Sequence, residues 1–484
     1  MSFDAIFTKA DMAFGRFKKL PAAAKAELLR TIAEEIEQLG DELLETAHQE
    51  SNLPLARLTG ERGRTVGQLR LFASLLEEGS WLEATIDTAI PDRMPLPRPD
   101  LRRMLIPLGP VVVFGASNFP LAFSTAGGDT ASALAAGCPV IYKEHPAHPK
   151  TSQLVYGAIQ KALQRCELPE GIFQHVSGGT DVGQQLVQHP QAKAVAFTGS
   201  FKGGKAIFDL ACQREVPIPV FAEMGSVNPI FVLPEKAAGN GEQLAAQAAQ
   251  SVLLGVGQFC TCPGLIFYPA SETTHTFLET FAEKLRDAPA EKMLHETICS
   301  NYYQHLKGLH THEGVEMILA PAEDLQTGGA ALAKTTAQQW LQNPSLQEEI
   351  FGPYAMVVTY QDEKELMQVA GKLQGQLTCT LWGTEEELTK AENLVDTLRE
   401  KCGRLLFAGV PTGVEVSHAM THGGPFPATT DSRSTSVGTY AIKRFARPVT
   451  FQSAPQELLP EELKDENPYK LWRTVNGQLT QDSI

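Results

Sequence analysis

The run VVVFG at residues 111–115 decides the fold of this chain. It is short, apolar and rich in β-branched residues, and it ends in glycine, which is typical of a buried parallel strand. Similar runs follow at residues 139–142 (PVIY) and 194–197 (AVAF), with helical patterns between them. Strands that alternate with helices predict βαβ units and a parallel sheet, so the expected fold class is α/β.

The alternation continues towards the C-terminus, and a second series begins near residue 228. Further strands are predicted over residues 172–176, 228–232, 265–268 and 356–360. Helices are predicted over residues 127–137, 151–165, 182–188, 203–212, 243–254 and 364–369. Two series of strands and helices indicate two α/β domains within one chain.

The flanking segments follow other patterns. Apolar residues at helical spacing predict one amphipathic helix over residues 22–48 and another over residues 61–76. Residues 91–110 carry six prolines and four arginines, which is too extended and polar for a core. Residues 441–451 are predicted to be one extended strand, and residues 455–465 are acidic.

The composition excludes several classes of function. The chain has 484 residues and a formal net charge of −15, which repels phosphate and argues against a nucleic-acid-binding protein. The sequence shows no signal peptide and no apolar stretch of membrane-spanning length, so we expect a cytoplasmic protein with reduced cysteines. Of the eight cysteines only Cys260 and Cys262 lie close together, so we predict no metal site.

A glycine-rich turn, GSFKGG at residues 199–204, follows a predicted strand and opens a helix. Gly199, Ser200 and Gly204 would let a phosphate approach the backbone N–H groups of a helix N-terminus. The spacing differs from the GxGxxG fingerprint, so this is not an ordinary Rossmann signature. A tight strand-to-helix turn without a ligand explains the glycines equally well.

Cys260 lies in GVGQFCTCPG at residues 255–264, just after a predicted helix. A cysteine flanked by glycines can face a cleft, where its thiolate is a good nucleophile. On composition alone, a small buried hydrophobe is the commoner role of a free cysteine. Cys262 precedes a proline and is the weaker candidate, so we interpret it as a packing residue or a secondary thiol.

Two further polar residues are candidates for acid–base chemistry and oxyanion binding. Glu223 lies in the apolar segment FAEMG, where partial desolvation would raise its pKa and suit a general base. Pairing with a distant lysine or arginine would explain this glutamate equally well. Asn118 in GASNFP follows a predicted strand, and its amide could donate to a developing oxyanion or simply hold a turn.

Taken together, these motifs resemble the aldehyde dehydrogenase superfamily, and the resemblance runs along nearly the whole chain. Each motif is weak alone, but all of them in this order and at these separations are specific. The resemblance is carried by residues 115–120, Lys143, residues 197–200, Gly204, residues 223–225, Asn228, Pro229, residues 257–260 and residues 349–353.

The resemblance implies a role for each matching residue. Cys260 would be the nucleophile, Glu223 the general base, and Asn118 the side-chain half of an oxyanion hole that the Cys260 backbone N–H completes. The reaction implied is NAD(P)-dependent oxidation of an aldehyde to a carboxylic acid through a thiohemiacetal and a thioester. The remaining matches would bind the adenine-side ribose (Lys143), the diphosphate (Gly199, Ser200 and Gly204) and the nicotinamide ribose and ring (Glu349 and Phe351).

The resemblance also bears on cofactor choice. Many NAD-preferring members place a glutamate three residues after the lysine, where it repels a 2′-phosphate, but this chain has Pro146 there. Lys143 and His148 could then meet the phosphate, so we predict NADP as cofactor. Asp181 stands in a loop where an arginine would suit a phosphate better, which keeps NAD as the alternative.

Residues 118–124 and 423–431 are similar to a narrower branch of the superfamily. That branch contains 2,5-dioxopentanoate (2-oxoglutarate semialdehyde) dehydrogenases and NADP-dependent fatty aldehyde dehydrogenases. Aromatic tunnel walls suit either substrate, and we rank the semialdehyde first. A carboxylate substrate needs a cation at the far end, for which Arg433 and Lys150 are candidates. The predicted tunnel walls are Phe119, Phe123, Phe259 and Phe426.

The architecture implied has three parts. An atypical Rossmann dinucleotide-binding domain would cover residues 1–90 and 108–225, and a second α/β catalytic domain residues 226–430. A small β oligomerisation arm and tail would cover residues 91–107 and 437–484 and would form a homodimer or homotetramer. A surface loop and an ordinary tail are the alternative interpretation of the arm.

Two other classes of protein are alternatives to an aldehyde dehydrogenase. A cysteine-dependent acyl-transfer hydrolase would use Cys260 and Glu223, but it would not need Glu349 and Phe351. A non-catalytic relative would need none of the three candidate catalytic residues. Both classes therefore explain fewer of the motifs than an aldehyde dehydrogenase does.

Overall fold

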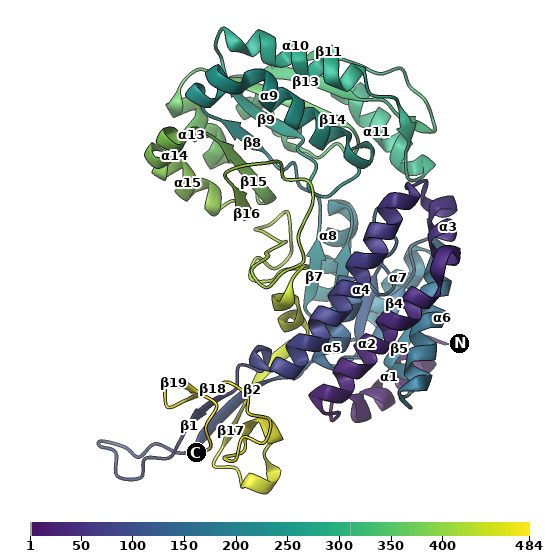
Figure 1. Cartoon of the computed structure of the whole chain (residues 1–484), viewed down its shortest axis with the longest axis vertical. Helices are drawn as coiled ribbons and strands as arrows, with labels where there is room; N and C mark the ends of the chain where they lie inside the picture. The colour runs from purple at the N-terminus through teal and green to yellow at the C-terminus, as the bar shows by residue number, and fades with distance from the viewer. Residues whose placement is uncertain (1, 310) are drawn as a thin grey trace.

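The computed structural model describes residues 2–309 and 311–484, which form two α/β units and a β arm (Figure 1). The first unit contains a five-stranded sheet in the order β5-β4-β3-β6-β7, and all its strands are parallel. Its strands are β3 (Val111–Phe114), β4 (Val140–Lys143), β5 (Phe173–Val176), β6 (Ala194–Thr198) and β7 (Val220–Glu223).

Alternate side chains of β3 enter cores on opposite faces of this sheet. Val111 and Val113 pack with residues of α2, α4, α5 and α6, whereas Val112 packs with residues of α1, α7 and α8. Because both faces are covered, the strand is apolar along its whole length. The helices are α1 (Phe3–Phe17), α2 (Ala22–Gln38), α3 (Gly40–Ser51), α4 (Leu55–Glu78), α5 (Gly128–Ala136), α6 (Pro149–Arg165), α7 (Thr180–Gln188) and α8 (Phe201–Cys212).

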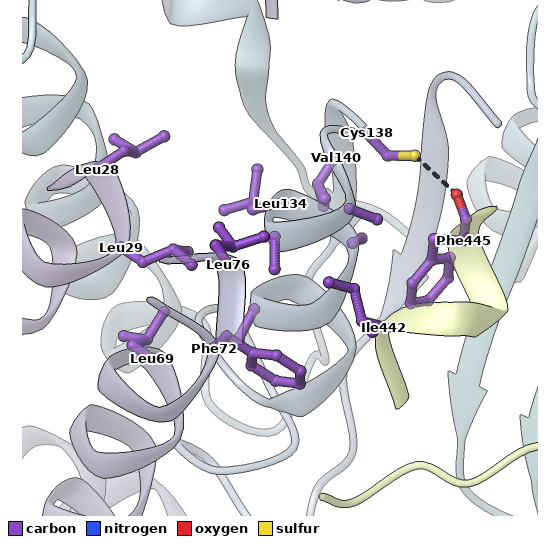
Figure 2. Packing of buried hydrophobic residues seen from close by; sticks show 14 of the residues in the cluster. Leu28, Leu29, Leu69, Phe72, Leu76, Leu134, Cys138, Val140, Ile442 and Phe445 are labelled. Atoms are coloured by element: carbon purple, nitrogen blue, oxygen red, sulfur yellow. Dashed lines mark hydrogen bonds between the residues drawn. The ribbon is translucent and has the colours of Figure 1, made fainter. Parts of the chain in front are cut away.

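Figure 2 shows how the larger of these cores is built. Leu28 and Leu29 of α2 and Phe72 of α4 lie on one side of α5, and a short 3₁₀ helix, η5 (Thr439–Phe445), closes the other side. The thiol of Cys138 donates to the carbonyl oxygen of Phe445 at 3.3 Å. A C-terminal segment is therefore part of the core of the first unit.

The second unit contains a seven-stranded sheet in the order β11-β13-β14-β9-β8-β15-β16. Only the edge pair β11–β13 is antiparallel among these neighbours. Its strands are β8 (Ile230–Val232), β9 (Leu265–Pro269), β11 (Glu316–Leu319), β13 (Ala331–Thr336), β14 (Tyr354–Tyr360), β15 (Gln376–Trp382) and β16 (Cys402–Leu406).

Helices cover both faces of the second sheet as well. Residues of α9 and α10 form the core on one face, and residues of α11, α12, α13 and α15 form the core on the other. A two-stranded ribbon of β10 (Glu291–Lys292) and β12 (Thr327–Gly328) lies beside α11. The helices are α9 (Pro234–Leu253), α10 (Thr273–Arg286), α11 (Glu296–Leu309), α12 (Ala337–Gln342), α13 (Glu363–Lys372), α14 (Glu385–Lys390) and α15 (Glu392–Arg399).

The arm is a separate five-stranded sheet in the order β17-β2-β1-β18-β19, and it projects from the first unit (Figure 1). It joins segments from distant parts of the sequence, because β1 pairs with β2 on one side and with β18 on the other. Its strands are β1 (Thr85–Asp87), β2 (Leu101–Pro107), β17 (Ala446–Gln452), β18 (Arg473–Val475) and β19 (Gln478–Thr480).

The structure corrects two predicted elements. The single helix expected over residues 22–48 is wrong: α2 ends at Gln38 and α3 begins at Gly40, whose φ of +58° breaks the helix. The single strand expected over residues 441–451 is also wrong. Its first half is η5, which is drawn into the first core by Ile442 and Phe445, and β17 starts only at Ala446.

Two expected domain boundaries also differ from the structure, because tertiary contacts assign the neighbouring segments to another part of the fold. The arm sheet already begins with β1, before residue 91, because β1 is hydrogen-bonded to β2 and β18. The segment η5 follows residue 437 but packs in the first unit.

Within residues 2–309 and 311–484, we find no helix with the length and apolar character that crossing a membrane requires.

Candidate active site

Cys260 lies in the loop between η3 (Leu254–Gly257) and β9, and two features fix this loop. The buried amide of Asn228 donates to the carbonyl oxygens of Cys260 at 2.8 Å and Cys262 at 3.0 Å. Gly257 has a φ of +66°, and a Cβ there would lie 2.1 Å from the carbonyl oxygen of Gly352. The position of the cysteine therefore depends on an asparagine and a glycine.

Glu223 is the last residue of β7, at the carboxyl end of the first sheet, and only 3% of it is exposed. Ligands bind at this end of parallel α/β sheets. The Ser436 hydroxyl donates to its Oε2. Its strand continues into Met224, whose N–H donates to Ala428 O at 2.8 Å. The glutamate thus faces the connection that crosses between the two units.

His422, which the sequence analysis did not identify, lies between the thiol and the carboxylate. Its Nε2 is 3.3 Å from Cys260 Sγ and 3.0 Å from Glu223 Oε1, and one ligand atom from each residue lies within 4.8 Å of the others. The Thr435 hydroxyl accepts from the His422 N–H at 2.8 Å and helps to hold it. Only its position, one residue before the Gly423-Gly424 pair, could have drawn attention to it.

The side chains of this cluster shift one another's pKa values. Burial opposes the charged form of His422, but the Glu223 carboxylate and the Cys260 thiol outweigh it and raise the pKa of His422 to about 10. Burial likewise opposes ionisation of Glu223, but His422 and Ser436 bring the pKa of this carboxyl below its ordinary value. The prediction that desolvation raises the pKa of Glu223 is therefore wrong. Both shifts favour an ion pair of an imidazolium and a carboxylate.

Asn118 reaches the cysteine loop from the first unit. It follows β3, and its Nδ2 donates to the carbonyl oxygen of Gln258 at 3.2 Å, two residues before Cys260. The Arg57 guanidinium donates to the Asn118 carbonyl oxygen at 2.7 Å. The structure thus brings Cys260, Glu223 and Asn118 to one place, between the two units.

Three of the four predicted tunnel residues lie together. The Phe119 ring is 5.2 Å from the Phe123 ring and 5.4 Å from the Phe259 ring, measured between centroids. Phe426 does not join them, because it is 54% exposed and packs on Phe201 at the start of α8. An exposed position after the Gly-Gly-Pro turn explains this difference.

The predicted diphosphate turn forms the N-terminus of α8. Ser200 caps this helix, and its Oγ accepts from the Gly203 N–H at 3.3 Å. A Cβ on Gly204 would lie 2.6 Å from the Met224 side chain, so the glycine lets α8 pack closely on β7. Lys143 ends β4 nearby in the sheet, and burial lowers its pKa while Glu144 and Asp181 oppose this shift. The helix N-terminus offers N–H groups to a phosphate, and Lys143 lies at the carboxyl end of the same sheet, so both fit the prediction of a dinucleotide site.

Glu349 and Phe351 lie in the segment before β14 and line a small cavity with Cys262 and Ser226. Burial raises the pKa of Glu349 to about 8, although the Ser226 N–H partly offsets this effect. A Cβ on Gly225 would lie 2.3 Å from Glu349 Oε2, so this glycine leaves room for the carboxyl group. Burial also raises the pKa of the Cys262 thiol, which makes it a poor nucleophile.

A glycine-rich helix N-terminus, a buried cysteine–histidine–glutamate cluster and an amide donor between two α/β units are typical of an oxidoreductase that works through a covalent intermediate. The model of the aldehyde dehydrogenase family matches residues 1–425, so the chain belongs to this family. It is therefore an enzyme that oxidises aldehydes with a nicotinamide dinucleotide.

Similar proteins agree with this assignment. An alpha-ketoglutaric semialdehyde dehydrogenase of Acinetobacter baylyi is 48% identical over 98% of this chain and 90% of its own. Alpha-ketoglutaric semialdehyde dehydrogenase 2 of Azospirillum brasilense is 49% identical over 96% of this chain and 89% of its own. A glyceraldehyde-3-phosphate dehydrogenase of Methanocaldococcus jannaschii, complexed with NADP, shares the fold with a TM-score of 0.78, at 19% identity and 93% coverage of both chains.

Proposed function

We propose that this protein oxidises 2,5-dioxopentanoate to 2-oxoglutarate with a nicotinamide dinucleotide as hydride acceptor. The two relatives of 48% and 49% identity carry this proposal, because both are named for alpha-ketoglutaric semialdehyde, which is the same compound. The compound has an aldehyde at one end and a 2-oxo carboxylate at the other. The site must therefore bind both a reactive carbonyl group and an anion.

In the first step, the thiolate of Cys260 attacks the aldehyde carbon and forms a thiohemiacetal. The imidazolium of His422, 3.3 Å from the sulfur, stabilises negative charge on the thiolate. The side-chain amide of Asn118 and the backbone N–H of Cys260 would donate to the oxyanion that develops on the substrate. We thus propose Cys260 as the nucleophile, His422 as the group that stabilises its thiolate, and Asn118 as an oxyanion donor.

The bound dinucleotide supplies the hydride acceptor, and the chain's own groups carry out the remaining steps. Loss of hydride leaves a thioester on Cys260. Glu223, which is ionised and buried beside the sulfur, accepts a proton from the water that attacks this thioester. Aldehyde, water and oxidised cofactor are thus converted to carboxylate, reduced cofactor and two protons.

The proposed cofactor is NADP, with NAD also accepted. The residues that fit the dinucleotide are Lys143, the α8 N-terminus at Ser200, and Glu349 with Phe351. Pro146 places no carboxylate against a 2′-phosphate, which favours NADP. Asp181 is close enough to raise the pKa of Lys143 against burial, so this carboxylate weakens the preference and keeps NAD usable.

The test is cofactor reduction followed by absorbance, with 2,5-dioxopentanoate and tetradecanal as substrates and NADP or NAD as cofactor. We expect kcat/KM for the semialdehyde to exceed that for tetradecanal by at least about tenfold, equal to about 1.4 kcal/mol. A preference for tetradecanal would contradict the proposal and favour fatty aldehydes, for which the cluster of Phe119, Phe123 and Phe259 is the supporting observation.

A further inference from the structure

We propose that Arg57 and Arg64 of helix α4 bind the carboxylate of the substrate and make the enzyme selective for short aldehydes with an acidic far end. This inference rests on the proposed oxidation of 2,5-dioxopentanoate and identifies the cation that such a substrate needs. The two arginines are seven residues apart in α4, so their side chains leave the same face of the helix.

Arg57 lies against the phenylalanine cluster beside the nucleophile. Its guanidinium carbon is 4.9 Å from the centroid of the Phe119 ring and 4.5 Å from that of the Phe259 ring. Phe259 directly precedes Cys260, and Phe119 directly follows Asn118. The Arg57 cation is therefore within the reach of a short substrate whose aldehyde group is at Cys260.

Arg64 approaches the same cluster from further along α4. Its guanidinium carbon is 5.5 Å from the centroid of the Phe123 ring, and this ring is 6.4 Å from the ring of His422. The charges of Cys260 and Glu223 also act on Arg64. The two guanidinium groups thus border the predicted tunnel, whose walls are apolar and whose reactive end is Cys260.

Both arginines keep buried N–H groups that find no acceptor among residues 2–309 and 311–484. These groups are Nη1 of Arg57 and Nε and Nη2 of Arg64. Each arginine is anchored by a single donated bond, from Arg57 to the Asn118 carbonyl at 2.7 Å and from Arg64 to the Val414 carbonyl. Buried N–H groups of a cation are costly without an acceptor, and a carboxylate offers two oxygens that match a guanidinium.

The neighbouring acidic groups do not satisfy these cations. Glu61 lies between the two arginines on α4, but its Oε1 accepts from the N–H groups of Leu121 at 2.8 Å and Ala122 at 2.9 Å, and burial raises the pKa of Glu61. Glu223 is paired with His422. Glu415 contributes only the smallest attraction on Arg64. A surplus of positive charge therefore remains on this face.

This assignment replaces the two cations suggested by the sequence. The side chain of Arg433 is 88% exposed and binds Asp431, and Lys150 is exposed at the start of α6. Both differ from Arg57 and Arg64, which lie against the phenylalanines next to the reactive cluster. The charge of Cys260 also acts on Arg404. Two nitrogens of Arg404, however, donate to the carbonyl groups of Pro411 and Gly413, so we infer that Arg404 holds the loop that contains these two residues.

The test compares 2,5-dioxopentanoate with pentanal, which has the same number of carbons and a neutral far end. For Arg57→Gln and Arg64→Gln we expect kcat/KM for the semialdehyde to fall about 10- to 100-fold, mostly through a higher KM, with pentanal changed less than about twofold. Arg70→Gln is the matched control, since Arg70 lies on the same helix in an exposed ion pair with Glu37. The Arg70→Gln variant should keep the wild-type kcat/KM for both substrates.

Equal losses with both substrates would overturn the inference and assign the arginines a structural role, and unchanged semialdehyde kinetics would place the anion site elsewhere. Arg57→Lys and Arg64→Lys keep the charge and guard against a folding defect; they should regain part of the lost semialdehyde activity. Inhibition of pentanal oxidation by glutarate tests the arginines separately from the proposed substrate. If the wild type does not oxidise 2,5-dioxopentanoate, glutarate inhibition alone tests whether Arg57 and Arg64 bind a carboxylate. Weaker inhibition of the glutamine variants would support this role, and unchanged inhibition would refute it.

Discussion

At the scale of single residues, the site is organised by His422, whose imidazole contacts both the proposed nucleophile and the proposed base. Its positive charge keeps Glu223 ionised in a setting where burial alone would protonate it. The motifs around Cys260, Glu223 and Asn118 could be recognised from the sequence because each has a characteristic order of neighbours. His422, Arg57 and Arg64 could not, since their importance comes only from contacts with residues far away in the chain.

The proposed roles of the nucleophile and the base predict different kinetic defects. Cys260→Ala should abolish oxidation, and Glu223→Gln should spare the first turnover of hydride transfer but slow steady-state turnover, because only hydrolysis needs the base. Stopped-flow absorbance of the reduced cofactor separates the two phases. Substantial turnover by Cys260→Ala, or loss of both phases in Glu223→Gln, would contradict these roles.

The raised pKa of His422 implies that the stability of the folded protein depends on pH. Its pKa of about 10 in the folded protein exceeds its ordinary value near 6.5, so its contribution is complete below pH ~6.5 and is lost as pH rises through about 10. The melting temperature of the wild type should therefore fall between pH 7 and 10, and that of His422→Asn should fall less. Calorimetry at several pH values measures this difference, and parallel curves would contradict it.

At the scale of elements, the βαβ alternation made four of the five strands of the first sheet predictable, but only β8, β9 and β14 of the seven strands of the second. The failures have physical causes in single residues or in the tertiary structure. Gly40 divides the expected helix over residues 22–48 by adopting positive φ. Ile442 and Phe445 turn the expected strand over residues 441–451 into η5, because burial in the first core outweighs their strand propensity. Neither effect is visible in a local pattern.

The loop that carries the cysteine should be sensitive to one added methyl group. Gly257→Ala should lower the melting temperature and the activity, because a Cβ would clash with the Gly352 carbonyl and positive φ strains alanine by about 1–2 kcal/mol. Gly239→Ala in α9 is the control, since a Cβ there meets nothing within 4 Å. Equal melting temperatures of the two variants would refute the structural requirement for glycine at position 257.

At the scale of the whole molecule, the arm extends away from the two units (Figure 1). It also exposes apolar side chains. Met94, Leu96 and Leu479 are 84%, 69% and 67% exposed. The arm sheet also ends in two open edge strands, β17 and β19, which can pair with another chain. These features support the proposal that the arm forms a homodimer or a homotetramer.

Light scattering after size exclusion tests this proposal. The wild type should have a mass of two or four times 52.6 kDa, and the double variant Met94→Glu, Leu96→Glu should shift towards the monomer because charge opposes burial of the loop. Met12→Glu, at a methionine of α1 that is 75% exposed, should leave the mass unchanged. A monomeric wild type would contradict an oligomerisation role of the arm.

The two bonds that Glu61 accepts from Leu121 and Ala122 join α4 to the loop that contains Asn118. The helix with the proposed selectivity groups is thus fastened to the first unit, whereas the cysteine belongs to the second. Positions 57 and 64 also lie in a different stretch of the sequence from Asn118, Glu223, Cys260 and His422, so substrate choice and bond-making chemistry are encoded separately. New specificities can arise from changes at positions 57 and 64 while the reactive cluster is inherited intact, and the same two positions are where an engineer would begin.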